Sequence, residues 1–332
     1  MRIKNHFILL FFICIEFMAV GQGLRYSQAY VLSSNINPSL TGLGNSYKFG
    51  LLHRNQWSKL PSNLLSTGLN LELTKESGDL AGAIVLNQTK STSALVENEF
   101  GLTARKTVSF GDSKMLHFGV SALYGSINVA KEKLVFGDQL NTDGSISEVT
   151  AENIDGIFSK SYVDIMSGVS VNVDGLFFGV SAKYLNRPNR SLMGGDYKQP
   201  MHLHFFSAYH IHSTLTNLPF SKPNEIFEIG LRPFMVFETQ NGYSSIDLGI
   251  YATFDPVLLG VKYRGLSVGK ENDFNYGNKD ALSIILGYEL EKVSITYSYD
   301  IIFTELSNSG GTHELGLIFR KPLKNGGGTV CF

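Results

Sequence analysis

The sequence predicts an all-β fold, a transmembrane antiparallel β-barrel of the outer-membrane type with about fourteen strands. Three observations support this prediction. Apolar and polar residues alternate with a period of two, the links between the alternating segments are short and long in turn, and charged residues make up only 17% of the chain, against ~25% in ordinary soluble domains. The alternation is clearest in residues 292–300, where Val293, Ile295, Tyr297 and Tyr299 share one face.

Each expected strand is a run of alternating residues bounded by turn-forming residues. Most runs are ~9 to 11 residues long, the length that a tilted strand needs to cross a bilayer. In chain order, the strands are expected near residues 45–54, 64–74, 80–90, 95–108, 114–124, 162–172, 175–184, 201–212, 226–238, 245–254, 258–266, 281–289, 292–300 and 312–319.

The lengths of the links favour a barrel over a large soluble β-sandwich, which is the alternative fold. Tight links are expected at residues 75–79, 111–113, 173–174, 255–257 and 290–291, and long links at 55–63, 125–161, 185–200, 267–280 and 301–311. If both termini of the chain lie in the periplasm, the tight links are periplasmic turns and the long links are outer loops, as in bacterial barrels. The link 213–225 is longer than this rule expects.

The two faces of each strand predict which side meets lipid. In residues 116–124, 176–184 and 259–264, leucine, valine, phenylalanine and tyrosine alternate with glycine, serine, lysine and arginine. Backbone groups in hydrocarbon must pair within a closed sheet, so the apolar faces are assigned to lipid and the polar, glycine-rich faces to the lumen.

The start of the chain predicts a secretory signal peptide. Arg2 and Lys4 precede an apolar stretch, residues 7–20, that is too short to span a membrane. Cleavage is expected after Gly21, which gives a signal peptide at 1–21, a periplasmic N-terminal segment at 22–44, a barrel at 45–320 and a short C-terminal tail at 321–332. Cys331 is then the only mature cysteine, so an internal disulfide is excluded. The expected location is the outer membrane of a Gram-negative bacterium.

The sequence argues against catalysis, cofactors and nucleic acid. The formal net charge is −1, which gives no electrostatic reason for nucleic-acid binding. We find no Walker loop, no His-Glu-x-x-His and no Gly-x-Ser-x-Gly motif beside His117 or His313. His202, His204, His210 and His212 share one strand face, but His204 and His210 are ~20 Å apart along it. We therefore interpret these histidines as a hydrated lumen face rather than as a metal site.

Several motifs outside and inside the expected strands resemble one family. Residues 26–30 (YSQAY) and 36–42 (INPSLTG) resemble the "FSQY…NPAYAG" opening of the PorP/SprF proteins of the type IX secretion system. Residues 47–57 (YKFGLLHRNQW), 204–206 (HFF), 260–264 (GVKYR), 296–300 (TYSYD) and 309–315 (SGGTHEL) are similar to that family's "YRNQW", "RHYF", "GVSYR", "GYSYD" and "SGSHEI" segments. The chain departs from the pattern where NPSLTG lacks the aromatic residue and where no arginine precedes His204.

The resemblance implies an outer-membrane component of a secretion and gliding machine in Bacteroidota. Its implied partners are the periplasmic ring, the peptidoglycan-binding components, and a large secreted adhesin cargo, with outer-membrane lipid around the barrel. The candidate partner-docking or family-motif residues are Asn37, Pro38, Gly42, Arg54, Asn55, Gln56, Trp57, His204, Tyr299, Asp300, His313 and Glu314.

Three of these residues also have plain structural interpretations. Trp57 lies where an interfacial belt residue would lie, and Asn37 with Pro38 is typical of a chain reversal. A third class of function, passive transport of hydrophobic or other substrates through a porin-like lumen, stays open. Such a lumen would be plugged either by the acidic loop 125–161, which carries Asp138 and Glu148, or by the N-terminal segment.

Overall fold

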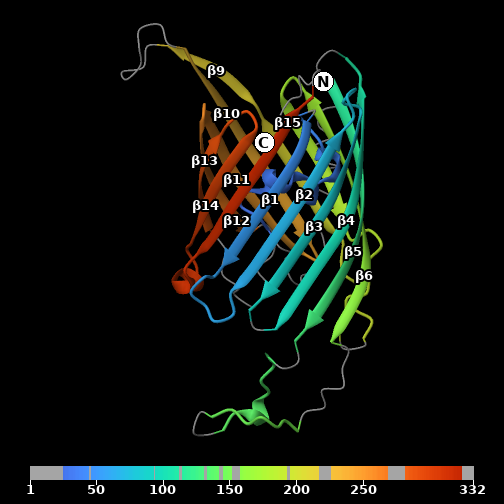
Figure 1. The fold of residues 1–332 in the computed structure, drawn as a ribbon, viewed down its shortest axis with the longest axis vertical. Helices are drawn as coiled ribbons and strands as arrows, with labels where there is room; N and C mark the ends of the chain where they lie inside the picture. Colours follow the sequence, from blue (N-terminus) through green and yellow to red (C-terminus); the bar gives the residue numbers. More distant parts are fainter. Residues whose placement is uncertain are drawn as a thin grey trace, which may run out of the picture.

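The computed structural model describes residues 25–44, 46–92, 94–111, 114–130, 133–141, 145–151, 158–192, 195–216, 226–267 and 281–323. The expected signal peptide, the tail beyond residue 323 with Cys331, and the link 217–225 lie outside these residues. The described strands form one antiparallel sheet that closes into a barrel (Figure 1). Among the described residues, no helix has the length and apolar character needed to cross a membrane.

The strands follow the expected order along the chain. They are β1 Ser46–Gln56, β2 Leu64–Thr74, β3 Leu80–Ser91, β4 Leu95–Ser109, β5 Lys114–Val129, β6 Ser159–Val173, β7 Leu176–Lys183, β8 His202–Tyr209, β9 Ile211–Thr216, β10 Ile226–Gln240, β11 Tyr243–Phe254, β12 Val257–Ser267, β13 Ala281–Glu289, β14 Val293–Ile302 and β15 Thr312–Pro322. Short 3-10 helices are η1 Ala29–Asn35, η2 Pro38–Leu40, η4 Gly137–Gln139 and η5 Glu305–Ser309.

The barrel closes between its first and last strands, because β1 pairs with β15 along its whole length. β8 and β9 both pair with β10, one after the other, so the wall has fourteen positions and the predicted fold class is confirmed. The expected strand 201–212 is interrupted at His210. Ala208 faces Phe234 and Ile211 faces Leu231, so the register is the same on both sides of the break. Pro233 lies opposite the break and has no N–H to donate.

The two faces of the strands separate as predicted. On β5, Phe118, Val120 and Tyr124 point outward and are exposed, whereas His117 and Ser121 point inward and are buried. The sequence underestimated the length of β5 and β6, which continue to Val129 and start from Ser159 at the side of the longest loop. At the end of β5 the alternation reverses, because Ile127 is buried on the lumen side and Ser126 and Asn128 lie on the other face. At the start of β6, Ser159, Lys160 and Ser161 are polar on both faces.

The links differ in length between the two ends of the barrel. Short turns join β2 to β3, β6 to β7, β11 to β12 and β13 to β14 at the end where β1 starts and β15 finishes, the upper end in Figure 1. We call this the short-turn end and the opposite one the long-loop end. One link at the long-loop end is also tight: Asn241 and Gly242 have φ of 49° and 85°, the combination that a two-residue hairpin turn requires.

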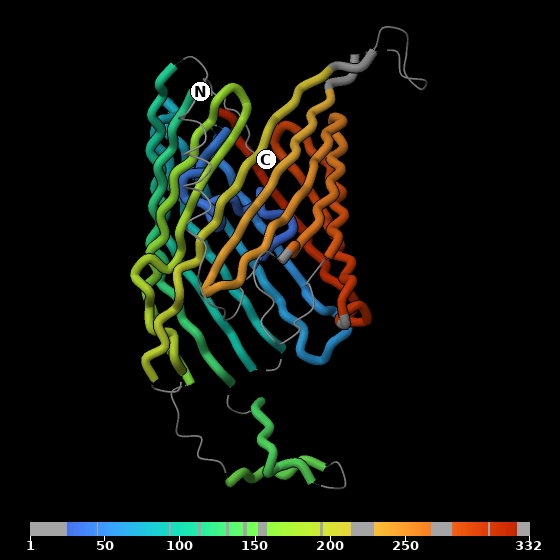
Figure 2. Tube along the Cα trace, turned by 180° about the vertical axis from the view of Figure 1, so that it is seen from behind, coloured from blue at the N-terminus to red at the C-terminus, as the bar shows by residue number. Residues whose placement is uncertain are grey.

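The N-terminal segment, residues 25–44, lies inside the barrel as a plug (Figure 2). Its apolar side chains Tyr30, Val31, Leu32 and Leu40 are buried. They form one cluster with lumen-facing residues from eight strands: Leu52, Phe177, Phe206, Ala208, Phe234, Val236, Tyr251, Leu258, Ile285 and Ile318. Burial of this apolar surface is the main stabilisation available to the plug.

Candidate functional site

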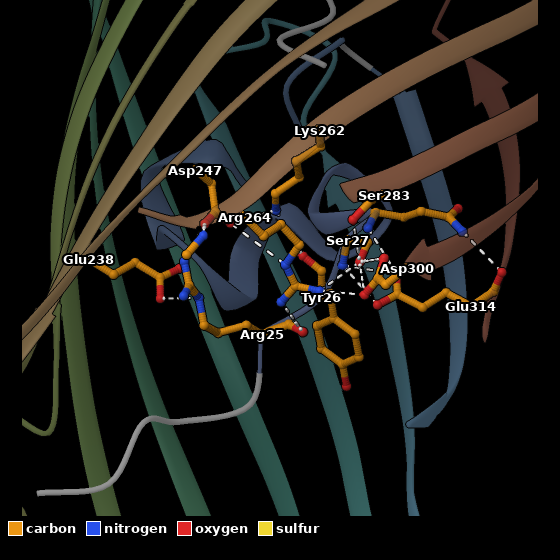
Figure 3. A network of polar contacts seen from close by, with 12 residues as sticks. Arg25, Tyr26, Ser27, Glu238, Asp247, Lys262, Arg264, Ser283, Asp300 and Glu314 are labelled. Atoms are coloured by element: carbon orange, nitrogen blue, oxygen red, sulfur yellow. Dashed lines mark hydrogen bonds and ion pairs between the residues drawn. The ribbon is translucent and has the colours of Figure 1, made fainter. Parts of the chain in front are cut away.

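The most concentrated polar site is the contact between the start of the plug and the barrel wall (Figure 3). Three of its wall residues, Arg54 on β1, Asp300 on β14 and Glu314 on β15, come from motifs far apart in the sequence. Each lies on the lumen face of its strand, and Arg54 is directly opposite Glu314 in the β1–β15 pairing. All three are almost completely buried. We call these residues, with Arg264 of β12, the plug anchor.

The plug anchor binds the backbone of the plug. The carboxylate of Glu314 accepts hydrogen bonds from the backbone N–H of Ser27 at 2.8 Å and of Gln28 at 2.9 Å, and pairs with Arg54. Asp300 accepts from the Ser27 hydroxyl at 2.7 Å. Hydrogen bonds to ionised groups are the stronger kind, so the anchor fixes the position of the plug in the lumen.

The charges of the anchor are balanced inside the barrel. Arg264 lies 2.6 Å from Asp300, and Arg54 lies 3.3 Å from the same carboxylate. Two carboxylates therefore face two guanidinium groups. Buried charges need this pairing, since an unpaired charge away from water is very costly.

A second ion-pair group holds the first described residue of the plug. Arg25 contacts Glu238 of β10 at 2.9 Å and Asp247 of β11 at 2.7 Å. Asp247 also pairs with Lys262 of β12 at 2.9 Å, and Lys262 donates to the backbone oxygen of Tyr26. The start of the plug is thus bound to both strands of the β11–β12 pair.

The side chain of Gln28 reaches the wall between the strands that carry the anchor. Its amide nitrogen donates to the Ser298 hydroxyl at 3.0 Å, and its oxygen accepts from the Thr296 hydroxyl. A glycine is needed beside it, because a Cβ on Gly316 would lie 2.8 Å from the Gln28 side-chain oxygen. The residues of the YSQ motif, 26–28, therefore bind the plug to the barrel wall.

Asn37 and Pro38 tie the middle of the plug to the opposite wall. The Asn37 side chain caps η2 by accepting from the Ser39 N–H at 2.9 Å, and it donates to the Val180 carbonyl at 3.1 Å. Pro38 occupies the first helical position, where its missing N–H costs nothing. The Ser39 hydroxyl donates to Ser170 at 2.8 Å.

Gly42 ends the plug near the short-turn end. Its φ of +63° suits glycine. Its N–H donates to Glu72 at 2.7 Å, and its carbonyl accepts from the Thr74 hydroxyl at 3.0 Å. Lys48 stabilises the Glu72 carboxylate at 3.4 Å. Of the predicted site residues, Asn37, Pro38, Gly42, Arg54, Asp300 and Glu314 all therefore serve the plug.

The remaining predicted residues lie elsewhere. Gln56 accepts a hydrogen bond from Arg54 behind the anchor. Asn55 accepts from Asn63, and the Trp57 N–H donates to the Gly311 carbonyl, both at the long-loop end. On the outward face, the His313 ring lies 4.9 Å from the Tyr299 ring.

His204 is in the lumen but forms no metal site in the described part of the chain. Its ring lies 4.0 Å from that of His202, and neither of its ring nitrogens has a hydrogen-bond partner. Among the described residues, no group of three His, Cys, Asp or Glu side chains is placed to hold a metal ion.

A further, half-buried polar cluster lies against β4, β6 and β7 closer to the long-loop end. Lys183 of β7 contacts Glu99 of β4 at 2.9 Å, and Arg190 from the loop after β7 contacts Glu97 at 2.5 Å. The Arg190 guanidinium also stacks over the Tyr162 ring at 4.7 Å. Sequence reasoning missed this cluster, as it missed Arg25, Ser27, Gln28, Glu238, Asp247, Lys262 and Arg264 as plug contacts. The placement of Lys262 and Arg264 on a polar strand face was the available signal.

Comparison with known proteins assigns the family. A family model described as type IX secretion system membrane protein PorP/SprF matches residues 20–319. The chain belongs to the PorP/SprF family. The match covers every motif that carries a residue of the plug anchor. In this PorP/SprF protein, the segments that resemble the family in sequence are therefore also the segments that bind the plug. A search of curated proteins found no match.

Solved structures similar to this PorP/SprF protein are membrane barrels of low sequence identity. The outer membrane protein Omp33 of Acinetobacter baumannii is 9% identical, with a TM-score of 0.42, covering 84% of this chain and 100% of that one. BamA from Haemophilus ducreyi lacking POTRA domains 1–3 is 10% identical, with a TM-score of 0.42, covering 84% and 70%. The CymD monoaromatic hydrocarbon channel is 12% identical, with a TM-score of 0.45, covering 91% and 93%.

Proposed function

We propose that this protein is a non-enzymatic outer-membrane component of the type IX secretion system. It supports the export and surface attachment of adhesin-type cargo, or docks the periplasmic secretion and gliding machinery, or both. The observation that carries the proposal is the family match over residues 20–319, nearly the whole chain. In this arrangement the short-turn end faces the periplasm, the long-loop end faces outward, and the signal peptide ends at Gly21.

The plug supports a scaffold rather than an open channel. Residues 25–44 contact wall residues on opposite sides of the lumen, from Glu238 and Glu314 on one side to Ser170 and Val180 on the other. The apolar cluster around Tyr30 and Leu32 fills the space between them. A porin-like barrel for passive transport, including transport of hydrophobic substrates, is the alternative, and it would require the plug to leave.

The charged side chains of the plug anchor have structural partners, which supports a role without catalysis or cofactors. A catalytic site needs a nucleophile and a base that are available to a substrate. In the part of the chain that the structure describes, the Asp300 carboxylate accepts from the Ser27 hydroxyl, and the Glu314 carboxylate accepts from the Ser27 N–H and pairs with Arg54. We propose the same structural role for Asn37, Pro38 and Gly42.

Deletion of the gene tests the proposal. Surface and secreted proteins of the deletion strain are compared with those of the parent and of a strain complemented with the wild-type gene. Loss of one large adhesin alone supports a cargo-dedicated partner, and loss of most cargo supports a core component. If neither set changes while the protein conducts ions in planar bilayers, the passive transport function replaces the secretion function.

A further inference from the structure

One strand of the barrel has a free edge. β9 and the start of β10 form a two-stranded ribbon that rises past the rim at the short-turn end (Figure 1). The neighbouring wall stops lower, because β7 begins at Leu176 opposite Tyr209. The last contact on that side is the His210 N–H, which donates to the Gly175 carbonyl at 3.1 Å. Beyond it, β9 pairs with β10 and with no other strand in the described residues.

The backbone direction identifies the groups on this free edge. The N–H of His210 points toward β7, and the directions of N–H and C=O alternate along a strand. The register with β10 is unbroken through His210. The N–H and C=O groups of His212, Thr214 and Thr216 therefore point to the free side, whereas those of Ile211 and Ser213 point to β10.

The free edge lacks the features that protect exposed edges. Natural edge strands carry charged residues, proline or bulges that prevent pairing with other chains. The sequence of β9 is IHSTLT, with no lysine, carboxylate, proline or glycine. A two-stranded ribbon is also marginally stable by itself in water, so an added third strand would stabilise it.

We propose that β9 accepts an extended strand from a periplasmic protein partner, which continues the barrel sheet by backbone hydrogen bonds. This inference rests on the proposed function, in which the short-turn end faces the periplasmic machinery. The partner strand is uncharged over the part that meets β9, and it places an apolar side chain beside Ile211, which is exposed. Asp174 is exposed where the free edge starts, so a basic residue at that end of the partner strand is complementary.

Proline substitution at one position separates pairing on the two sides of β9. Thr214→Pro removes an N–H from the free edge and leaves every N–H that points to β10 in place. Thr214→Ala keeps the N–H and is the matched control. Ser213→Pro removes an N–H that bonds β10 and reports the effect of disturbing the ribbon itself. Retention of the compact barrel on unheated gels shows that each variant has folded.

The measurement is co-purification of the periplasmic ring and peptidoglycan-binding components with the barrel from cross-linked cells. We expect Thr214→Pro to reduce recovery about tenfold or more, with Thr214→Ala unchanged. Equal recovery with Thr214→Pro and wild type overturns strand addition but leaves the proposed function standing. If wild type recovers none of these components, the docking function itself fails. Barrel dimers that Thr214→Pro abolishes would instead assign the edge to a second copy of the chain, against the proposal.

Discussion

Replacing Glu314 by glutamine removes the charge of the plug anchor while keeping the size of the side chain. Glu314 is 1% exposed and accepts from the N–H groups of both Ser27 and Gln28. The substitution places an amide NH2 where an acceptor is needed and leaves Arg54 with one charged partner, Asp300 at 3.3 Å. Removing one partner of a buried ion pair costs about 3 to 5 kcal/mol. Since 1.4 kcal/mol is tenfold, opening of the plug start becomes about a hundredfold to several thousandfold more frequent.

Hydrogen exchange measures this opening directly. The amides of Ser27 and Gln28 are protected by Glu314, so a peptide covering residues 25–32 reports their exchange in detergent-solubilised protein. We expect exchange at these amides to accelerate by the stated factor in Glu314→Gln. The control is Glu97→Gln, which breaks a carboxylate–arginine pair in the other lumen cluster. Unchanged exchange in Glu314→Gln, or equal acceleration in Glu97→Gln, would refute the anchor.

Three further predictions address the plug and the turns. Gly50→Ala places a Cβ 2.6 Å from the carbonyl oxygen of Val31 in the plug, and it should lower the free energy of unfolding by about 1 to 3 kcal/mol in thermal unfolding. Gly82→Ala is the control and should leave the free energy of unfolding unchanged, because the nearest atom to its Cβ is 3.5 Å away. Wild-type protein should stay closed in planar bilayers, and deletion of residues 25–44 should produce open-channel current; closed deleted barrels would contradict the plug. Hydrogen bonds from Lys106 and then Ser77 lower the pKa of Asp79. The ionised Asp79 carboxylate contributes its stabilisation above the ordinary aspartate pKa of about 3.9. This stabilisation is lost as the pH falls toward the lowered pKa of Asp79 in the folded protein. In an NMR titration, Lys106→Met should raise the pKa of Asp79, and an unmoved titration would show that the pair is not formed.

The sequence predicted the wall of the barrel well because each strand's pattern is local. A residue such as Val120 points outward and its neighbour Ser121 faces the lumen whatever the rest of the chain does. The break at His210 was not predictable from that segment alone. Its cause, Pro233, lies on the partner strand and acts only through the register.

The plug site was predicted only in part. Arg54, Asp300 and Glu314 were selected because their motifs resemble those of a family, and alternation placed Asp300 and Glu314 on a polar strand face. Their convergence on Ser27 depends on how β14, β15 and β1 follow one another around the barrel. This ordering results from closure of the whole sheet, which no single segment encodes.

The plug also sets an order for assembly. Ser27 and Glu314 are 287 positions apart in the chain, yet they share a hydrogen bond. The acceptor for the first part of the plug is therefore supplied by the last strand of the barrel, next to the seam between β15 and β1. Before that seam forms, the N-terminal segment lacks the part of its binding site where Arg54 and Glu314 lie side by side. Closing the seam and docking the plug are thus coupled steps, and a machine that inserts this protein into a membrane must keep the N-terminal segment on the inner side of the sheet until the final strand arrives.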